Sequence, residues 1–318
     1  MPRTRIFFTT DVHGSERCFV KFLNAGKFYK ANCIILGGDI TFKAIVPLVK
    51  KSDGNVYVKF LGENYTLNSE SEIALMEKKI RSIGFCPYQM SEESFAEFLS
   101  DKRKQDELFE TLVVDMIKRW VSIAESKLKD GHVKCFISPG NDDSLVVDEY
   151  LKSSKYIIYP EDSVVRLDDH HEMITLGVSN ITPWRCIRDM EEDAIEKKIE
   201  KLVSQTNDLK NCIFNIHVPP YGTPLDQAPK LDQDLKPVAL PTGGVEMINV
   251  GSISVRKAIE KHQPLLGLHG HIHESRGIFK IGRTLCINPG SEYTEGILKG
   301  FLADITEGGI RDYLITTG

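Results

Sequence analysis

The chain has 318 residues, of which 41% are hydrophobic and 27% are charged, and this is an ordinary composition for a globular protein with a sizeable core. Its formal net charge of −5 argues against a protein whose main partner is the nucleic-acid backbone. The seven cysteines contain no CxxC pair, which suits reduced thiols rather than a disulfide framework. Because no apolar run is long enough for a signal peptide or a membrane span, we expect a soluble, cytoplasmic protein.

Five short apolar runs end in polar residues that could bind a ligand. In chain order they are RIFFTTD ending at Asp11, CIILGGD ending at Asp39, VKCFISPGN ending at Asn141, CIFNIH ending at His217 and PLLGLHGHIH ending at His273. Continuous apolar runs are typical of strands buried on both faces, and ligands gather at the carboxyl ends of strands in sheets covered by helices. The pattern predicts an α/β protein with one site at its strand ends.

The segment from residue 15 to 30 predicts a helix between the first two strands. Ser15 is placed as its N-cap, and Phe19, Phe22 and Leu23 recur at helical spacing on one face. A strand, a helix and a second strand in this order indicate a βαβ unit at the start of the chain.

About a hundred residues separate Asp39 from Asn141, far more than an ordinary α/β connection, so this interval must carry structure of its own. We expect a hairpin that turns at 62–64, a helix capped by Ser69 and a longer helical stretch with an apolar stripe. That stripe runs through Leu112, Met116, Trp120 and Ile123. The expected organisation is a single domain over 1–318, with a hairpin and helical insert over 41–130. Whether the insert caps the site or presents a solvated charged face stays open.

Further along the chain the pattern predicts short strands around 163–169 and 172–179 and a helix over 190–205. The Pro-rich stretch 219–241 predicts a long irregular loop, which follows His217 directly and can wall the site. A strand over 283–290 and a closing hairpin around Gly308 and Gly309 complete the chain.

Seven polar side chains gather at the predicted strand ends: Asp11, His13, Asp39, Asn141, His217, His271 and His273. Imidazoles, carboxylates and an amide together suit Mn²⁺, Fe²⁺ or Zn²⁺, and the set is too rich in nitrogen for Ca²⁺. Seven groups are too many for one tetrahedral ion and about right for two ions that share a carboxylate. A single polar residue after a strand would be better explained as a helix cap or turn residue. Five such strand-end motifs in one chain are much less probable as a structural coincidence.

The motifs D-x-H, G-D, G-N-x-D, H-x-P-P and G-H-x-H, in this order, resemble the calcineurin-like metallophosphoesterase superfamily. The resemblance spans Asp11 to His273 and implies a two-sheet β-sandwich flanked by helices, with a dinuclear metal centre at the loop ends. It implies one metal held by Asp11, His13, Asp39 and His273, and a second held by Asp39, Asn141, His217 and His271. Asp39 would then bridge the two ions, and His269 would pack behind the ligands or orient one of them.

A second, less specific resemblance joins HVPPYGTPLD, the closing NPGS and the insert after Asp39 to predicted phosphoesterases related to bacterial cyclic-nucleotide phosphodiesterases. It does not name a substrate.

The sequence departs from the family motif at Asp142, because many members have histidine after the motif asparagine. A carboxylate ionised at neutral pH cannot donate a proton, and it repels a dianionic monoester more than a monoanionic diester. We therefore hypothesise hydrolysis of phosphodiester or nucleotide-type bonds by attack of a metal-bound hydroxide, with Asp142 and Asp143 as candidate catalytic residues. The expected substrate is a small phosphate ester or nucleotide.

Three alternatives follow from the same residues. A phosphomonoesterase or protein phosphatase would need another acid in place of the motif histidine. A non-catalytic metal-binding scaffold would be marked by lost ligands, and none of the seven is lost. Nucleic-acid processing has little support from the net charge, and the chain shows no membrane-binding pattern.

Overall fold

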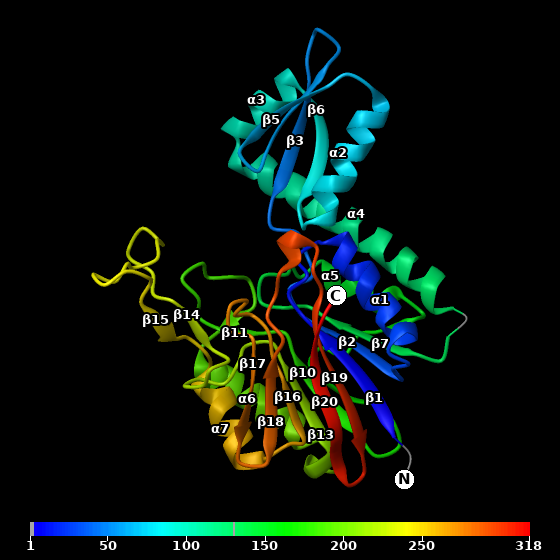
Figure 1. Ribbon diagram of the computed structural model, residues 1–318, viewed down its shortest axis with the longest axis vertical. Coiled ribbons are helices and arrows are strands. Elements are labelled where there is room, and N and C mark those ends of the chain that lie inside the picture. The colour runs from blue at the N-terminus through cyan, green and yellow to red at the C-terminus, as the bar shows by residue number, and fades with distance from the viewer. Residues whose placement is uncertain (1–2, 130) are drawn as a thin grey trace.

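Two six-stranded sheets form the body of the computed structural model, which describes residues 3–129 and 131–318 (Figure 1). The first sheet has the order β20 (Gly309–Thr317), β19 (Lys299–Thr306), β1 (Thr4–Thr9), β2 (Cys33–Gly37), β7 (Lys134–Ser138) and β8 (Ile157–Ile158). The second has the order β17 (Gly277–Ile281), β18 (Thr284–Asn288), β16 (Leu266–Leu268), β13 (Cys212–Ile216), β10 (Glu172–Leu176) and β9 (Ser163–Arg166). The expected two-sheet sandwich is confirmed.

Helices cover the outer face of each sheet, so the central strands are buried on both sides. In β1, Phe8 packs in the apolar core between the sheets, while its neighbour Phe7 packs outward in the core beneath the helices. The helices on the first sheet are α1 (Glu16–Phe28), α4 (Lys102–Leu128) and α5 (Val147–Ser153), and those on the second are α6 (Glu192–Val203) and α7 (Ile253–His262). Burial on two faces is why these strands are apolar throughout their length.

The strands that precede the polar tips run parallel within each sheet. In the first sheet β1 pairs with β2 and β2 with β7, and in the second β10, β13, β16 and β18 follow one another in parallel. Because parallel strands end at a common edge, the loops that follow them gather on one side of the sandwich.

The interval after Asp39 forms a separate lobe at the top of the view in Figure 1. The predicted hairpin, β4 (Val56–Phe60) with β5 (Glu63–Leu67), belongs to a four-stranded sheet completed by β3 (Ile45–Lys50) and β6 (Cys86–Ser91), which we did not expect. α2 (Glu70–Ser82) and α3 (Glu92–Ser100) flank it, and Asp101 separates α3 from α4. The second half of α4 returns to the sandwich, where Trp120 stacks on Phe19 with ring centroids 4.0 Å apart.

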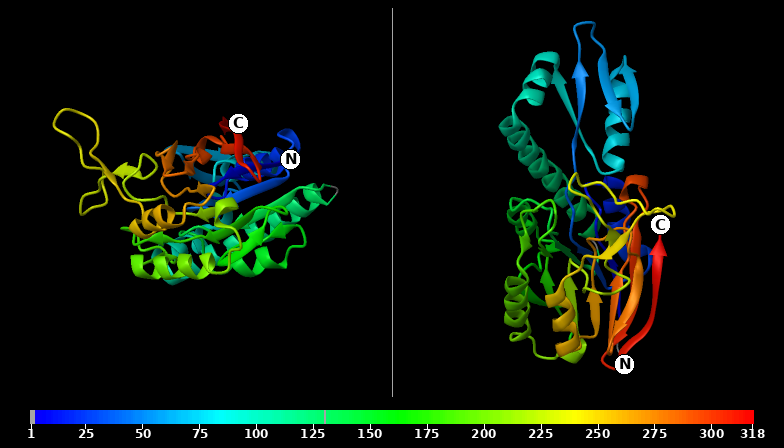
Figure 2. Two further views of the ribbon diagram at one scale, coloured as in Figure 1. Left: turned by 90° about the horizontal axis from the view of Figure 1, so that it is seen from below. Right: turned by 90° about the vertical axis from the view of Figure 1, so that its left-hand side faces the viewer.

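The Pro-rich stretch is more ordered than the expected irregular loop. β14 (Gln227–Pro229) pairs antiparallel with β15 (Met247–Asn249), so our expectation is wrong for residues 227–229. The partner strand lies beyond the Pro-rich stretch, and the residues between the two strands project from the sandwich (Figure 2). We call residues 227–249 the arm.

A short parallel pair, β11 (Ser179–Asn180) with β12 (Asp189–Met190), brackets the loop 181–188. In the part of the chain that the structure describes, no helix combines the length and apolar character that crossing a membrane requires.

Candidate metal centre

The seven expected ligand residues come together at the strand ends, and both sheets contribute to them. The first sheet supplies Asp11 and His13 after β1, Asp39 after β2 and Asn141 after β7; the second supplies His217 after β13 and His271 and His273 after β16. All except His271 and His273 are buried, and these two are partly exposed.

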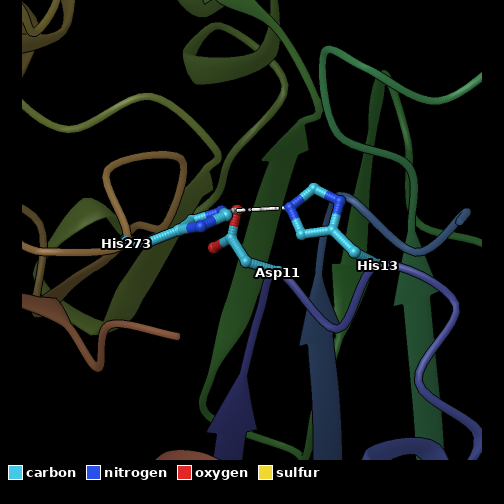
Figure 3. Close-up of side chains that lie close together, drawn as sticks. All are labelled: Asp11, His13 and His273. Carbon is cyan, nitrogen blue, oxygen red and sulfur yellow. Dashed lines mark hydrogen bonds and ion pairs between the residues drawn. The ribbon is translucent and has the colours of Figure 1, made fainter. Parts of the chain in front are cut away.

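Asp11, His13 and His273 form one group of potential ligands (Figure 3). The Nε2 atoms of the two imidazoles face each other at 3.0 Å, and Asp11 Oδ1 lies 3.4 Å from His273 Nε2. A carboxylate oxygen and two ring nitrogens that converge in this way are donors for a transition-metal ion.

Asp39, His217 and His271 form a second group. Asp39 Oδ1 lies 3.4 Å from His217 Nε2, and Asp39 Oδ2 lies 3.6 Å from His13 Nε2 of the first group. The Asp39 carboxylate therefore lies between the two groups, with one oxygen directed toward each.

Three buried atoms of the proposed ligands lack a hydrogen-bond partner among the described residues, namely His13 Nδ1, His217 Nε2 and Asn141 Oδ1. In His217 and Asn141 the other polar atom is held by the protein. His217 Nδ1 donates to the Gly37 carbonyl at 3.1 Å, and Asn141 Nδ2 donates to Asp189 Oδ1 at 2.9 Å. Asn141 thus presents a lone pair to the cluster, and His217 presents Nε2, which can bind a metal once it has lost its proton; partners outside the ligand set orient ligands in this way in metal sites. The donor set fits two divalent ions.

The backbone at this centre adopts conformations that side chains rarely take. Asp11, His13, Asp39 and His271 have φ of +53°, +38°, +49° and +68°. Gly140 is required for a close approach, because a Cβ there would overlap Asp39 Oδ1. Strained residues at one place indicate a functional site, since each costs about 1–3 kcal/mol that the surrounding fold must offset.

Protonation at the centre follows from burial and from the neighbouring charges. Burial opposes ionisation of Asp11 and Asp39, but His273 holds the pKa of Asp11 below its ordinary value and His217 does the same for Asp39. Burial lowers the pKa of His271 to about 4, whereas the Asp39 carboxylate outweighs burial and raises the pKa of His217 to about 9. Without a metal, a proton on His217 balances the carboxylates, and a metal would displace it.

No family model matches the chain. A curated protein of Methanocaldococcus jannaschii, the uncharacterized protein MJ1162, is 36% identical over 153 residues, or 48% of this chain. The chain spans 61% of the length of that relative. TT1561 of Thermus thermophilus is similar in structure, with a TM-score of 0.55 and 13% identity over 100% of this chain and 99% of that one. Another crystal structure gives a TM-score of 0.60 at 15% identity over 99% of both chains.

The helix-covered sandwich matches solved structures over nearly the whole chain, and the D-x-H, G-D, G-N-x-D, H-x-P-P and G-H-x-H motifs follow its strands in the predicted order. The chain thus shares its overall fold with TT1561, and its motifs lie where the resemblance to the calcineurin-like metallophosphoesterase superfamily implied.

Asp142 directly follows Asn141, where many members of the superfamily that the motifs resemble have a histidine. It lines the cavity beside the metal centre and forms an ion pair with Lys43. Its carboxylate groups with His13 and Asp39 as a third set of potential ligands. Burial alone would lower the pKa of Lys43, but Asp39 and Asp142 raise it well above its ordinary value. Lys43 is therefore a charged ammonium at the site, and no pattern in the sequence marks it.

Asp143, the other candidate catalytic residue, has no exposed surface. Its carboxylate accepts hydrogen bonds from the backbone N–H groups of Ile40, Thr41 and Gly140, and from the Thr41 hydroxyl at 2.7 Å. These bonds join the loop that carries Asp39 to the loop that carries Asn141. The structure thus gives Asp143 contacts that position two ligand loops.

His269 lies where the resemblance implied, behind the ligands. It is fully buried, and its Nδ1 donates to the Ile216 carbonyl at 2.8 Å, next to His217 in the chain.

A cavity of about 950 Å³ opens beside the candidate metal centre. Asp39, Asn141, His271 and His273 line its base, and the loop 181–188 and the arm supply its sides. The expectation that the stretch after His217 walls the site is confirmed, because Ala228 to Leu231 line this cavity.

Proposed function

We propose that the protein is a dinuclear metal-dependent phosphoesterase that hydrolyses phosphodiester or nucleotide-type phosphate bonds. The observation that carries the proposal is the position of Asp39 between two groups of potential ligands, beside buried ligand atoms that have no hydrogen-bond partner among the described residues. A scaffold without metals would leave these polar atoms buried at a cost of about 1–3 kcal/mol each.

The proposed ligands divide into two sets that share Asp39. The first set is Asp11, His13, Asp39 and His273, and the second is Asp39, Asn141, His217 and His271. Bound ions would supply Lewis acidity, which lowers the pKa of water and neutralises charge on the phosphate.

Residues around the ligands hold them in place. Asp189 fixes the amide of Asn141 so that Oδ1 faces the centre. Asp143 joins two ligand loops, and we assign it a positioning role rather than contact with the substrate.

The ion pair between Lys43 and Asp142 determines the charge that a substrate meets beside the metals. Paired with Lys43, Asp142 adds no net charge, but it cannot donate a proton as the motif histidine would. A diester with an acidic leaving group needs little protonation, so we favour diesters. Lys43 is the one observation that favours a phosphomonoesterase, because an ammonium attracts a dianion more strongly than a monoanion.

The test is hydrolysis of an aryl phosphodiester and of the matching monoester by Mn²⁺-loaded protein, with metal content measured on the same samples. Asp39→Asn should abolish turnover and reduce the metal content below two ions per chain. Asp169→Asn, at an exposed position of the sandwich, serves as the matched control.

Diester turnover that disappears only in Asp39→Asn supports the proposal. Dominant monoester turnover favours the phosphomonoesterase, and substantial activity in Asp39→Asn defeats the bridging role of Asp39. Tight binding of two ions without turnover of either ester would favour the non-catalytic scaffold.

A further inference from the structure

The cavity beside the metal centre is much larger and more apolar than a phosphate group requires. Its volume of about 950 Å³ is at the upper end of pockets that enclose whole small molecules, which are typically about 300–1,000 Å³. Its sides carry four apolar side chains with large exposed fractions: Trp184 at 63%, Leu235 at 46%, Ile181 at 44% and Ile248 at 38%. Apolar side chains gathered at one hollow mark a binding surface.

The first side of the cavity is anchored to a proposed metal ligand. Asp189 accepts hydrogen bonds from the backbone N–H groups of Thr182 and Cys186 at 2.9 Å, and with its other oxygen from the amide of Asn141. The loop that presents Ile181 and Trp184 is thus fixed by the carboxylate that orients Asn141.

The second side is anchored to the loop after β16. The Ser275 hydroxyl donates to the Gln227 carbonyl at 2.5 Å, and Ser275 follows His273 by two residues. The arm, which presents Leu235 and Ile248, therefore begins at a point tied to the loop of a proposed ligand.

Three polar side chains of the 181–188 loop, its flank and the arm are bonded within the protein, and the exposed Glu274 lines the cavity outside these walls, next to His273 in the chain. Asn180 Nδ2 donates to the Val250 carbonyl at 3.2 Å, the Thr182 hydroxyl to Asp189 Oδ2 at 2.6 Å, and Lys230 pairs with Glu246 at 3.0 Å. A nucleobase is recognised through hydrogen bonds to its edge as well as by stacking, whereas a hydrocarbon chain needs only apolar contact. The two walls of the cavity therefore suit a hydrocarbon chain better than a nucleobase.

Resting on the proposed phosphoesterase function, we propose that the substrate is a phosphoester with a long hydrocarbon group, which lies between the 181–188 loop and the arm while its phosphate meets the metals. Trp184, Ile181, Leu235 and Ile248 are then the residues that determine specificity for this group.

The first experiment compares methyl, butyl and octyl 4-nitrophenyl phosphate diesters with the Mn²⁺-loaded protein, because the leaving group is constant and only the chain grows. We expect kcat/KM to rise by roughly tenfold or more from methyl to octyl, since each buried methylene contributes to binding. Equal values for the three esters would overturn the proposal while leaving the phosphoesterase function intact.

Matched variants test whether the preference for the octyl ester depends on the cavity walls. Trp184→Ala and Leu235→Ser should each reduce the octyl-to-methyl ratio by roughly fivefold. Ile187→Ser and Leu240→Ser are the controls, because both residues are exposed on the same two segments and neither lines the cavity. A ratio that falls equally in the controls would overturn the assignment of these walls.

A binding measurement separates this inference from catalysis. The chain has two tryptophans, and Trp120 is buried with 3% exposed, so a change in emission on adding octylphosphonate reports on Trp184. Trp184→Phe, which should abolish the change, confirms its origin. We expect octylphosphonate to bind at least about tenfold more tightly than methylphosphonate.

The outcomes distinguish the two proposals. Tight octylphosphonate binding without turnover of any ester would support the apolar subsite and count against the phosphoesterase function. No preference for octylphosphonate would overturn the subsite, and adenosine monophosphate binding as tightly as octylphosphonate would also overturn it, because a flat base would then be the occupant.

Discussion

At the scale of single residues, the candidate centre combines unfavourable backbone conformations with buried ligand atoms that lack hydrogen-bond partners. Asp11, His13, Asp39 and His271 have positive φ, and His217 Nε2 and Asn141 Oδ1 lack partners among the described residues. Each feature costs stability, and neither contributes to the packing of the core. Their concentration at one point is the strongest structural sign that the fold is adapted to hold something there.

The Lys43–Asp142 pair predicts how charge sets substrate preference. Asp142→Asn leaves Lys43 unneutralised and should raise the monoester-to-diester ratio of kcat/KM by about three- to tenfold, since one unit of charge near a partly exposed phosphate is worth about 1 kcal/mol. Lys43→Met should shift the ratio the other way, and Lys43→Arg should restore it. Asp142→His, which supplies an acid, should raise monoester turnover while diester turnover holds.

Parallel assays of both esters across these four variants provide the measurement, with bound metal quantified in each. A ratio that stays constant, with metal content unchanged, would show that the pair does not face the substrate.

The grouping of the seven proposed ligand residues could be predicted from the sequence because each follows an apolar strand closely in the chain. Lys43, Asp189 and Trp184 could not, since nothing near them in the sequence distinguishes a site lysine, an outer-shell carboxylate or a cavity wall from ordinary surface residues. The sequence also could not separate Asp142 from Asp143 as candidate catalytic residues. Asp142 faces the cavity, whereas its neighbour Asp143 is buried.

At the scale of elements, α1 begins directly after the loop that carries Asp11 and His13. Its N-cap, Ser15, is fully buried and accepts from the Cys18 backbone N–H at 3.3 Å. The Ser15 hydroxyl also donates to the Ser82 carbonyl at 2.7 Å, which joins α1 to the end of α2. One side chain therefore caps a helix of the sandwich and anchors the lobe formed by the insert.

Ser15→Ala should lower the free energy of unfolding by about 1–3 kcal/mol, because it removes a cap and leaves the partly buried Ser82 carbonyl without its donor. Ser69→Ala is the matched control, since exposed Ser69 caps α2 through a single bond from the Glu72 N–H at 3.3 Å. Urea denaturation of both variants tests the difference, and an equal loss in the two would contradict the dual role of Ser15.

Elements could be predicted where periodicity and caps agreed, as in β1, α1 and the β4–β5 hairpin. β3 was missed because its short run contains Pro47, which the structure accommodates before pairing with β4 begins at Leu48. β14 lies in a Pro-rich stretch, and its pairing partner is distant in the chain. α7 had a usable signal, with Ser252 as N-cap and Val255 and Ile259 at helical spacing, but we assigned no helix there.

At the scale of the whole molecule, Glu161 links the two sheets and makes stability depend on pH. It lies between β8 of the first sheet and β9 of the second, and accepts from the Gly177 N–H at 2.8 Å. Burial raises the pKa of Glu161 to about 7. In the unfolded chain the pKa of Glu161 returns to its ordinary value of 4.5. Between pH 4.5 and about 7 the unfolded chain therefore loses this proton while the folded protein keeps it, so the free energy of unfolding falls over this range and stays low above it.

Glu161→Gln keeps an acceptor for Gly177 and removes the ionisation. We expect the variant to exceed the parent protein in unfolding free energy by about 1–3 kcal/mol at pH 8, with the gain disappearing below about pH 4.5. Urea denaturation at several pH values measures this, and a difference independent of pH would refute the titration of Glu161 as its cause.

Metal removal should act on the whole molecule as well. An ion present at a thousandfold excess over its dissociation constant stabilises the native state by about 4 kcal/mol, so chelation should lower Tm by roughly 5–15 °C. Asp39→Asn should show a much smaller shift. Calorimetry with and without chelator tests this, and an unchanged Tm despite complete loss of the ions would show that the ligands are held by the fold alone.

The proposed ligands are divided between two sheets, and this division relates metal binding to the order of folding. Neither sheet alone supplies a complete set of donors, because one brings the Asp11, Asp39 and Asn141 loops and the other the His217 and His271 loops. A nascent chain with only one sheet assembled would capture divalent ions weakly. If the proposed ions bind, tight binding would require both sheets to be joined in register, and the bound ions would then slow the separation of the two sheets.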